Sequence, residues 1–503
     1  MMGEHLPVLE VMLPLAAAPL CALLRRPSLA WGLATASAIF ALAGSVVMLL
    51  QVFPGGVISY HLGGWAPPWG IEFRLDAFNC FVLLIISLIG ALCMIYGRES
   101  VAREISQEDQ PLFCSMLLLC FAGMLGVVST GDAFNLFVFL EICSLSAYVL
   151  VAMGASRDKR ALTAAFTYLL SGTIGATFYV IGLGLVYALT GTLNMADMAM
   201  RIADLGDSIT LRVGFAFIIT GLGLKFAVFP LHQWLPNAYT YAPSMVTAFL
   251  SGTATKAAIY VSLRFLYTIF SPAFHFEAQT LQYVFLPLGL AGIFVASVVA
   301  VFQSNIKRLL AYSSIAQVGY ILVGVSFASI SGLTAAILHL FNHALMKSGL
   351  FLAVGCVVYR TGGCSVSSFR GLGSKMPWTM AAFVIGGLSI IGVPATVGFI
   401  SKWHLVLAAL ERGWWPVAFA MVAGSLLALF YFGRVIEAAY LHPAPDGATV
   451  TEAPPSMLIP LWVLTISCLA LGIYSELTVS LARAAAEALY LDPHAGLPAL
   501  AGP

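Results

Sequence analysis

The sequence predicts an all-α polytopic membrane protein with about fourteen transmembrane helices, and three observations lead to this fold class. Hydrophobic residues make up 60% of the 503 residues and charged residues only 9%, whereas soluble domains are about a quarter charged. The mean hydropathy is +0.96. Apolar runs of the length that crosses a bilayer recur from one end of the chain to the other.

The expected spans follow one another closely. The first run carries Glu10 but neither a basic leading segment nor a clear cleavage site, so we expect a retained helix. The long run at 161–190 predicts either one tilted helix or a helix with an interfacial end. The predicted spans are residues 6–24, 29–52, 77–97, 111–130, 132–153, 161–190, 211–231, 243–269, 281–302, 308–328, 331–359, 379–401, 413–440 and 457–474.

The connections between these spans leave no room for a soluble domain. The longest, residues 53–76, 191–210 and 442–456, are too short to enclose a core of their own. Beyond the last span, Ser480 to Asp492 predicts a short amphipathic surface helix.

The basic residues of the connections predict the orientation. When the loops are assigned alternately, most lysines and arginines fall on one side, which the positive-inside rule places in the cytoplasm. We therefore expect a multi-pass protein of the cell (inner) membrane with both termini outside. The cytoplasmic set is Arg25, Arg26, Arg98, Arg103, Arg157, Lys159, Arg160, Lys307, Arg308, Arg360, Arg370 and Lys375, and the outer set is Arg74, Arg201, Arg212 and Arg412.

Composition also limits the partners. A net charge of +1 gives no reason to expect nucleic-acid binding. The nine cysteines lie mostly inside apolar runs and never form CxxC, so we interpret them as small buried hydrophobes, without a zinc site or a disulfide framework. We expect no cofactor, because the chain carries no quinone, flavin, nucleotide or iron–sulfur motif.

One carboxylate lies alone inside an apolar run. In GDAFNLFVFLEICSLSAYVLV, residues 131–151, Glu141 is about nine residues, roughly 13 Å, from the nearer polar end of its helix. This depth is near the middle of a bilayer core about 30 Å thick. A carboxylate there costs several kcal/mol unless a cation or water stabilises it, so we interpret Glu141 as functional.

Lys225 is a candidate partner for this acid. It stands in GLGLKFAVFPLHQWLP and is followed by Pro230 and Pro236. Because proline removes a backbone hydrogen bond, we expect the helix to break just past the lysine. Transporters place ion sites at such broken helices. The alternative is a lysine that snorkels to the cytoplasmic surface.

Further bases lie at membrane depth on other helices. Lys256 is about thirteen residues into the run 243–269, among small residues that permit close helix contact; a purely structural ion pair is the alternative. His339, His343 and Lys347 recur every four residues, in one stripe about 12 Å long. The stripe predicts a proton wire, because histidine titrates near neutral pH. The other interpretations are a metal site, although no Asp or Glu accompanies the stripe, and hydrogen-bonded histidines of the core.

A second interrupted helix is predicted in GGLSIIGVPATVGFISKWHLV, where Pro394 precedes Lys402. Two broken helices with a lysine each, one in either half of the chain, indicate an inverted repeat, although the residues of the halves do not align convincingly. One buried acid and several buried bases together predict proton movement along the membrane plane. If the pair of Glu141 and Lys225 opens, the lysine loses its stabilisation and releases a proton inward.

These segments resemble the antiporter-like subunits shared by respiratory complex I and the multisubunit Mrp cation/proton antiporters. The likeness covers nearly the whole chain and is strongest from about 110 to 405. GDAFNLFVFLEICSLSAYVLVAMG and TGTLNMADMAMRIAD resemble the Mrp D subunit. KFAVFPLHQWLPNAYTYAPSMVTAFLSGTATKAAIY is similar to the broken seventh and lysine-bearing eighth helices of the family, and HLFNHALMKSGLFLAVG to its eleventh.

The resemblance implies fourteen helices with two inverted five-helix repeats and broken helices 7 and 12. It makes Glu141 and Lys225 the ion pair of helices 5 and 7, Lys256 the central lysine, the histidine stripe the link, and Lys402 the terminal lysine of a second channel. The implied divisions are 1–110 (helices 1–3), 111–270 (first repeat, helices 4–8), 281–440 (second repeat, helices 9–13) and 457–503 (last helix and amphipathic tail).

Four functions remain to be weighed. The first is a proton-translocating subunit of an Mrp-type sodium/proton antiporter. Such a chain is an ion-transporter subunit and not an enzyme. Its expected partners are other membrane subunits, the lipid bilayer and protons, and the sequence leaves open whether sodium is a further one. The second keeps the fold in a redox-driven assembly, such as complex I or a membrane-bound hydrogenase or formate-oxidising relative. The third is a stand-alone solute transporter, which the wide spread of the buried charges disfavours. The fourth is a scaffold with an inactive channel.

Overall fold

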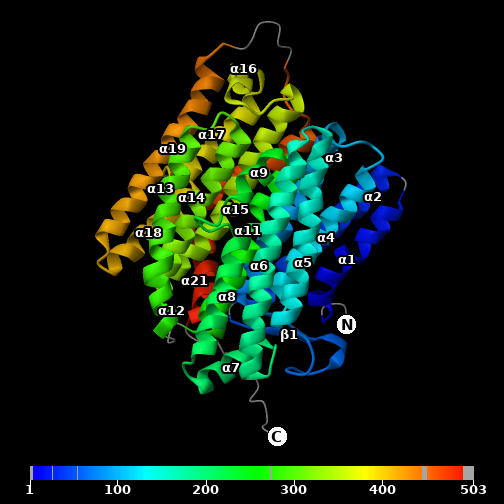
Figure 1. Ribbon diagram of the computed structural model, residues 1–503. Helices are drawn as coiled ribbons and strands as arrows, with labels where there is room; N and C mark the ends of the chain where they lie inside the picture. Colours follow the sequence, from blue (N-terminus) through cyan, green and yellow to red (C-terminus); the bar gives the residue numbers. More distant parts are fainter. Residues whose placement is uncertain (1–3, 25, 54, 272–274, 444–449, 491–503) are drawn as a thin grey trace.

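The computed structural model describes residues 4–24, 26–53, 55–271, 275–443 and 450–490. It is a bundle of long, roughly parallel helices, with β1 and α7 at one end and α16 at the other (Figure 1). In the predicted orientation, α16 marks the inner end of the bundle, and β1 and α7 mark the outer end. Arg25 of the predicted cytoplasmic set and Asp492 of the predicted tail helix lie outside the described residues.

The elements of the first half are α1 (Leu6–Leu23), α2 (Pro27–Val52), β1 (Ile58–His61), η1 (Leu62–Gly64), β2 (Glu72–Leu75), α3 (Ala77–Glu104), α4 (Gln110–Ser129), α5 (Ala133–Ala152), η2 (Met153–Ser156), α6 (Arg160–Thr190), α7 (Met195–Leu205), α8 (Ile209–Lys225), α9 (Trp234–Tyr241), α10 (Ser244–Gly252), α11 (Ala254–Leu263) and the π-helix η3 (Arg264–Ile269).

The second half contains α12 (His275–Thr280), the π-helix η4 (Leu281–Phe285), α13 (Leu286–Val301), α14 (Ile306–Ser326), α15 (Ile330–Thr361), η5 (Val366–Phe369), α16 (Leu372–Lys375), α17 (Pro377–Ile391), α18 (Val397–Glu411), α19 (Trp415–Leu441), α20 (Pro455–Ile473) and α21 (Glu476–Tyr490).

The predicted all-α membrane fold is confirmed. Within the described ranges, eleven helices are long and apolar enough to cross a membrane. The run 161–190 forms one helix of 31 residues, α6. Two of the other three predicted spans are present as pairs of shorter helices, 243–269 as α10 with α11 and 379–401 as α17 with α18. The third, 211–231, contains only α8, and α9 begins beyond its predicted end. The connection 53–76 adds a short antiparallel ribbon, β1 and β2, that the sequence did not predict.

The first predicted break follows Lys225, the last residue of α8. Ala227 adopts a positive φ of 59° there, and the indole of Trp234 donates a hydrogen bond to the carbonyl of Leu224 over 2.9 Å. Pro230 lies in the break, as predicted. The assignment of Pro236 as a helix breaker is wrong, because it occupies the first turn of α9, where a missing N–H leaves no hydrogen bond unmade.

The second predicted break separates α17 from α18. Gly392 and Ala395 have positive φ angles of 93° and 69° on either side of Pro394. The two half-helices cross closely, because a Cβ on Gly398 would lie 1.7 Å from the carbonyl oxygen of Ser389. The break of this span is therefore confirmed.

A third break, at Thr253, interrupts the span 243–269 that was predicted as one helix. Thr253 has φ −123° and ψ −58°, outside the helical region. Its hydroxyl donates to the carbonyl of Phe249 over 2.7 Å, and that of Ser251 to Ala248 over 3.1 Å. Hydroxyls that satisfy backbone carbonyls in this way let a membrane helix break without proline.

The tail helix α21 forms, and its apolar side faces the protein. Leu481, Ala485 and Leu489 are buried, and the helix packs against α3 and α15. The predicted surface helix is therefore part of the bundle, because its apolar stripe is covered by other helices of the chain.

Glycines set the spacing between α6 and α8. A Cβ on Gly182 of α6 would lie 2.6 Å from the carbonyl oxygen of Gly214 of α8, closer than any side chain tolerates. Small residues let membrane helices approach to backbone contact, where packing replaces the hydrophobic drive. A second such contact, between Gly175 of α6 and Gly221 of α8, lies about one turn before Lys225.

We expect Gly182→Val to destabilise the protein by about 1–3 kcal/mol, as overpacking of a close contact does. Gly184→Val is the matched control on the same helix, because nothing lies within 4 Å of a Cβ there. Thermal melting of the purified protein in detergent compares the two. Equal melting temperatures would show that the α6–α8 contact does not limit stability.

Candidate functional site

The predicted pair of Glu141 and Lys225 is formed. The ammonium of Lys225 lies 3.1 Å from Glu141 Oε1 and donates to the hydroxyl of Ser144 over 2.7 Å. The lysine side chain is 8% exposed and the glutamate 25%. The carboxylate therefore lies at the lateral surface of this chain, while the lysine is inside.

Lys256 is fully buried at the start of α11. Its ammonium donates to the carbonyl of Ser251, in the last turn of α10, and lies 3.4 Å from the hydroxyl of Thr255. The break at Thr253 thus exposes the carbonyl end of α10 to a cation. The end of a helix carries a partial negative charge, which favours an ammonium there.

The predicted stripe on α15 is buried at all three positions, His339, His343 and Lys347. The two imidazole rings lie parallel, with centroids 6.3 Å apart. Lys347 donates to the carbonyl of Leu310 on α14 over 2.9 Å. Neither ring nitrogen of His343 has a hydrogen-bond partner among the described residues, so this imidazole has two sites available to water.

Lys256 belongs to the same cluster as the stripe. Gly252, just before the break that precedes Lys256, lies against the hydroxyl of Ser348. The helices touch at this point, because the hydroxyl of Ser348, next to Lys347, donates to the carbonyl of Ala248 on α10 over 3.2 Å. The structure therefore places the break in α10–α11 directly against the middle of α15.

The other end of the stripe reaches the second break. His339 Nδ1 lies 2.8 Å from the hydroxyl of Ser401, and Nε2 lies 3.1 Å from Gln317 Oε1. Lys402 follows Ser401 on α18 and donates to the carbonyls of Ile390 and Ile391, over 2.7 and 3.3 Å. Its ammonium also meets the Ser425 hydroxyl at 2.9 Å and lies 4.7 Å from the Tyr320 ring centroid.

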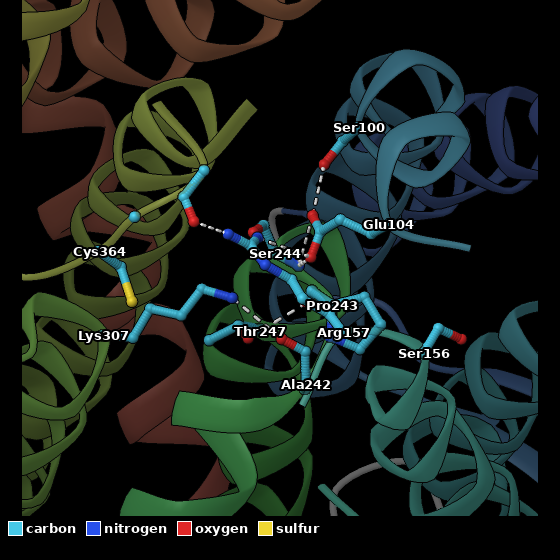
Figure 2. Close-up of polar contacts among 12 residues, drawn as sticks. Ser100, Glu104, Ser156, Arg157, Ala242, Pro243, Ser244, Thr247, Lys307 and Cys364 are labelled. Carbon is cyan, nitrogen blue, oxygen red and sulfur yellow. Dashed lines mark hydrogen bonds and ion pairs between the residues drawn. The ribbon is translucent and has the colours of Figure 1, made fainter. Parts of the chain in front are cut away.

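A cluster of charges holds the inner end of α10. Figure 2 shows Glu104 and Lys307 reaching the turn between α9 and α10. Both carboxylate oxygens of Glu104 accept from the backbone N–H of Ser244 at 3.1 Å, and Lys307 donates to the carbonyl of Ala242 over 2.9 Å. An anion at a helix start and a cation at a helix end are both favourable. Lys307, predicted as a loop charge, is buried.

A cavity of about 370 Å³ opens beside this cluster and is lined by Glu104, Arg157 and Lys307. Arg157 lies 3.8 Å from Glu104 and donates to the carbonyl of Gly362. The nearby Arg160 guanidinium holds the pKa of Asp158 below its usual range. Residues of several predicted cytoplasmic loops thus converge at one end of the bundle, around one polar cavity.

The structure adds residues that the sequence pattern did not single out. Gln317, Ser401 and Ser425 contact the buried bases, but serine and glutamine are too common to be selected without a neighbour in space. Two others carried a usable signal, a charge inside an apolar run. Arg264 is 8% exposed, and Glu10 on α1 is fully buried and accepts a hydrogen bond from Ser45 over 2.5 Å.

The fold and this row of buried charges define a class of protein, a membrane subunit of the antiporter-like kind that moves ions within a larger assembly. The chain belongs to the family described as NADH:quinone oxidoreductase/Mrp antiporter, transmembrane, whose model matches residues 130–428. It is therefore one subunit of a multisubunit membrane complex of the Mrp or complex I type.

Individual relatives come from both branches. The chain is 43% identical to NADH-quinone oxidoreductase subunit N of Desulforudis audaxviator over 495 residues, covering 95% of this chain and 98% of that one. It is 30% identical to the Na(+)/H(+) antiporter D subunit of Alkalihalophilus pseudofirmus, covering 79% and 78%. A chain of the archaeal membrane-bound sulfane sulfur reductase, a respiratory complex, superposes with a TM-score of 0.88 at 31% identity over 98% of both chains.

We expect Glu141→Gln and Lys225→Ala each to abolish nearly all proton transport by the assembled complex, because each leaves the other charge without its partner. Ser144→Ala is the control: it removes a hydrogen bond to Lys225 but keeps the ion pair, so most transport should remain. Acidification assays in inverted membrane vesicles measure the effect. Normal transport by assembled Glu141→Gln would contradict a role for the pair.

Proposed function

We propose that this chain translocates protons through the row of Glu141, Lys225, Lys256, the α15 stripe and Lys402. The observation that supports this most directly is that the later members of the row, from Lys256 through the α15 stripe to Lys402, lie on elements that touch one another. The helix break that precedes Lys256 lies against the middle of α15, His339 touches Ser401, and Lys402 follows on α18. Each of these bases is buried, and all except His343 are held by a carbonyl, a hydroxyl or an amide. The two ring nitrogens of His343, unpartnered among the described residues, leave room for water to complete the row at that point.

The first pair acts as the control point of this row. With Glu141 in contact, the charged form of Lys225 is stabilised; when the pair opens, the lysine loses that stabilisation and its proton moves inward. Glu141 is partly exposed at the side of the chain. We propose that a neighbouring subunit reaches the pair there, so that events elsewhere in the complex open and close it.

The host complex is the finer part of the proposal. The 43% identity with an NADH-quinone oxidoreductase subunit over 95% of the chain favours a redox-driven assembly. A sodium/proton antiporter of the Mrp type is the second candidate, supported by the 30% identity with an antiporter D subunit over 79% of the chain.

Purification of the native complex through a tag on this chain separates these two hosts. Iron–sulfur subunits in the purified complex support the redox-driven host, and their absence together with small membrane subunits supports the antiporter. Transport that depends on sodium and needs no electron donor would contradict the redox-driven proposal.

We expect Lys402→Ala to block proton transport while the complex still assembles, because one proton carrier is lost beside a helix break. Lys402→Arg is the sharper variant: arginine keeps the positive charge at the carbonyls of α17 but does not release its proton, so it should also be inactive. Lys375→Ala, at an exposed lysine, is the control. Transport by Lys402→Arg at the normal rate would show that the residue is structural.

A further inference from the structure

A second cavity lies at the outer end of the bundle, opposite the inner cluster. It has a volume of about 450 Å³, and its lining includes Asp76, Asn79, Tyr260, Arg264 and Thr268. The helix α21 forms one wall through Arg483 and Glu487, which pair with each other at 2.8 Å. The proposed row of proton carriers does not use any of these residues.

Arg264 closes the inner wall of this cavity. Its guanidinium lies 2.5 Å from Asp76 Oδ1, donates to the side-chain oxygen of Asn79, and reaches the hydroxyl of Tyr260 at 3.2 Å. It also lies over the rings of Phe78 and Tyr260, 5.4 and 5.5 Å from their centroids. These contacts hold the guanidinium on its protein side, while the side chain lines the cavity on the other.

The same helix connects this arginine to the central lysine. Lys256, Tyr260 and Arg264 recur every four residues and so share one face of α11 and η3. Lys256 and Arg264 are about 12 Å apart along the axis. Tyr260 is the middle residue of this stripe, and its hydroxyl accepts from Asn79 Nδ2 over 2.7 Å and from Arg264 Nε over 3.2 Å, so the proton of the hydroxyl remains to be donated.

The cavity also offers a place for water close to this face. Thr268 is one of the lining residues, and its hydroxyl is buried beside the cavity without a hydrogen-bond partner among the described residues. The lining of the cavity is mostly apolar, but its wall also carries the charged side chains of Asp76 and Arg264. Ordered water binds where such polar partners are available. Water there would reach from the outer end of the bundle to the guanidinium.

We propose that Arg264 is an electrostatic barrier that prevents protons in the outer cavity from reaching Lys256. The guanidinium is permanently charged, and a fixed arginine beside a narrow polar path is a known means of excluding protons and cations. Asp76 holds the arginine in place. The proposal rests on the proposed function only in placing Lys256 on the proton path.

The test is passive proton leak through the intact complex in proteoliposomes, measured as the decay of an imposed pH gradient with no energy source. We expect Arg264→Gln to raise the leak roughly tenfold, the effect of one unit charge at about 12 Å with an effective permittivity of about 20. Arg264→Lys keeps the charge and should remain tight.

Asp76→Asn distinguishes two roles of Arg264: a charge that repels protons, and a partner in an ion pair that holds the helices together. This variant breaks the same ion pair, but asparagine still caps α3 through its side-chain oxygen, and the arginine charge remains. We expect no increase in leak. An equal leak in Asp76→Asn and Arg264→Gln would overturn the proposal, because both variants would then act by loosening the helices.

Two additions to the leaking variant trace the route. The first addition is Thr268→Cys, and a membrane-impermeant cationic thiol reagent should then stop the leak of the double variant. The control for the native cysteines is Arg264→Gln alone, treated with the same reagent. Lys256→Ala added to Arg264→Gln should also stop the leak. The proposal would be overturned if the assembled Arg264→Gln complex did not leak, or if both additions left its leak unchanged. These outcomes do not depend on the result for Lys402→Ala, which tests the proposed function.

Discussion

The structure depends on the contact between a buried ammonium and the carbonyl end of an interrupted helix. Lys256 meets the last turn of α10 and Lys402 meets that of α17. A lone charge in a bilayer core costs several kcal/mol, and carbonyls inside an unbroken helix are already bonded. The break frees carbonyls for the lysine, and the lysine satisfies carbonyls that would otherwise be unpaired, so that each feature stabilises the other.

The unbroken helix α15 links these two sites. It contains 32 residues and is buried along nearly its whole length, so its polar side chains are shielded from lipid. One of its serines touches α10 beside the first site, and one of its histidines touches α18 beside the second. A rigid helix between two interrupted ones keeps the bases in line, while the breaks give each lysine polar surroundings in which it can gain or lose a proton.

Charges at both ends hold the segment 244–269 that carries Lys256. Glu104 and Lys307 fix its inner start, and Arg264 with Asp76 fixes its outer end. The two ends differ in chemistry: a carboxylate contacts the inner start, whereas the outer end carries a fixed cation facing a cavity. This difference would let protons approach Lys256 from one side and oppose their approach from the other.

The sequence by itself determined the membrane fold, two of the three breaks and the row of buried bases, because apolar runs, prolines and charges inside those runs are local signals. Glu141 and Lys225 could be paired because both charges lie at membrane depth, the lysine precedes a proline break, and the family resemblance implies the pair. Only the tertiary structure decided the break at Thr253, the burial of Lys307 and the partners Gln317 and Ser401. The hydroxyls that permit a break without proline, and the neutral groups that hold a buried base, are ordinary residues until the folded chain brings them against a charge.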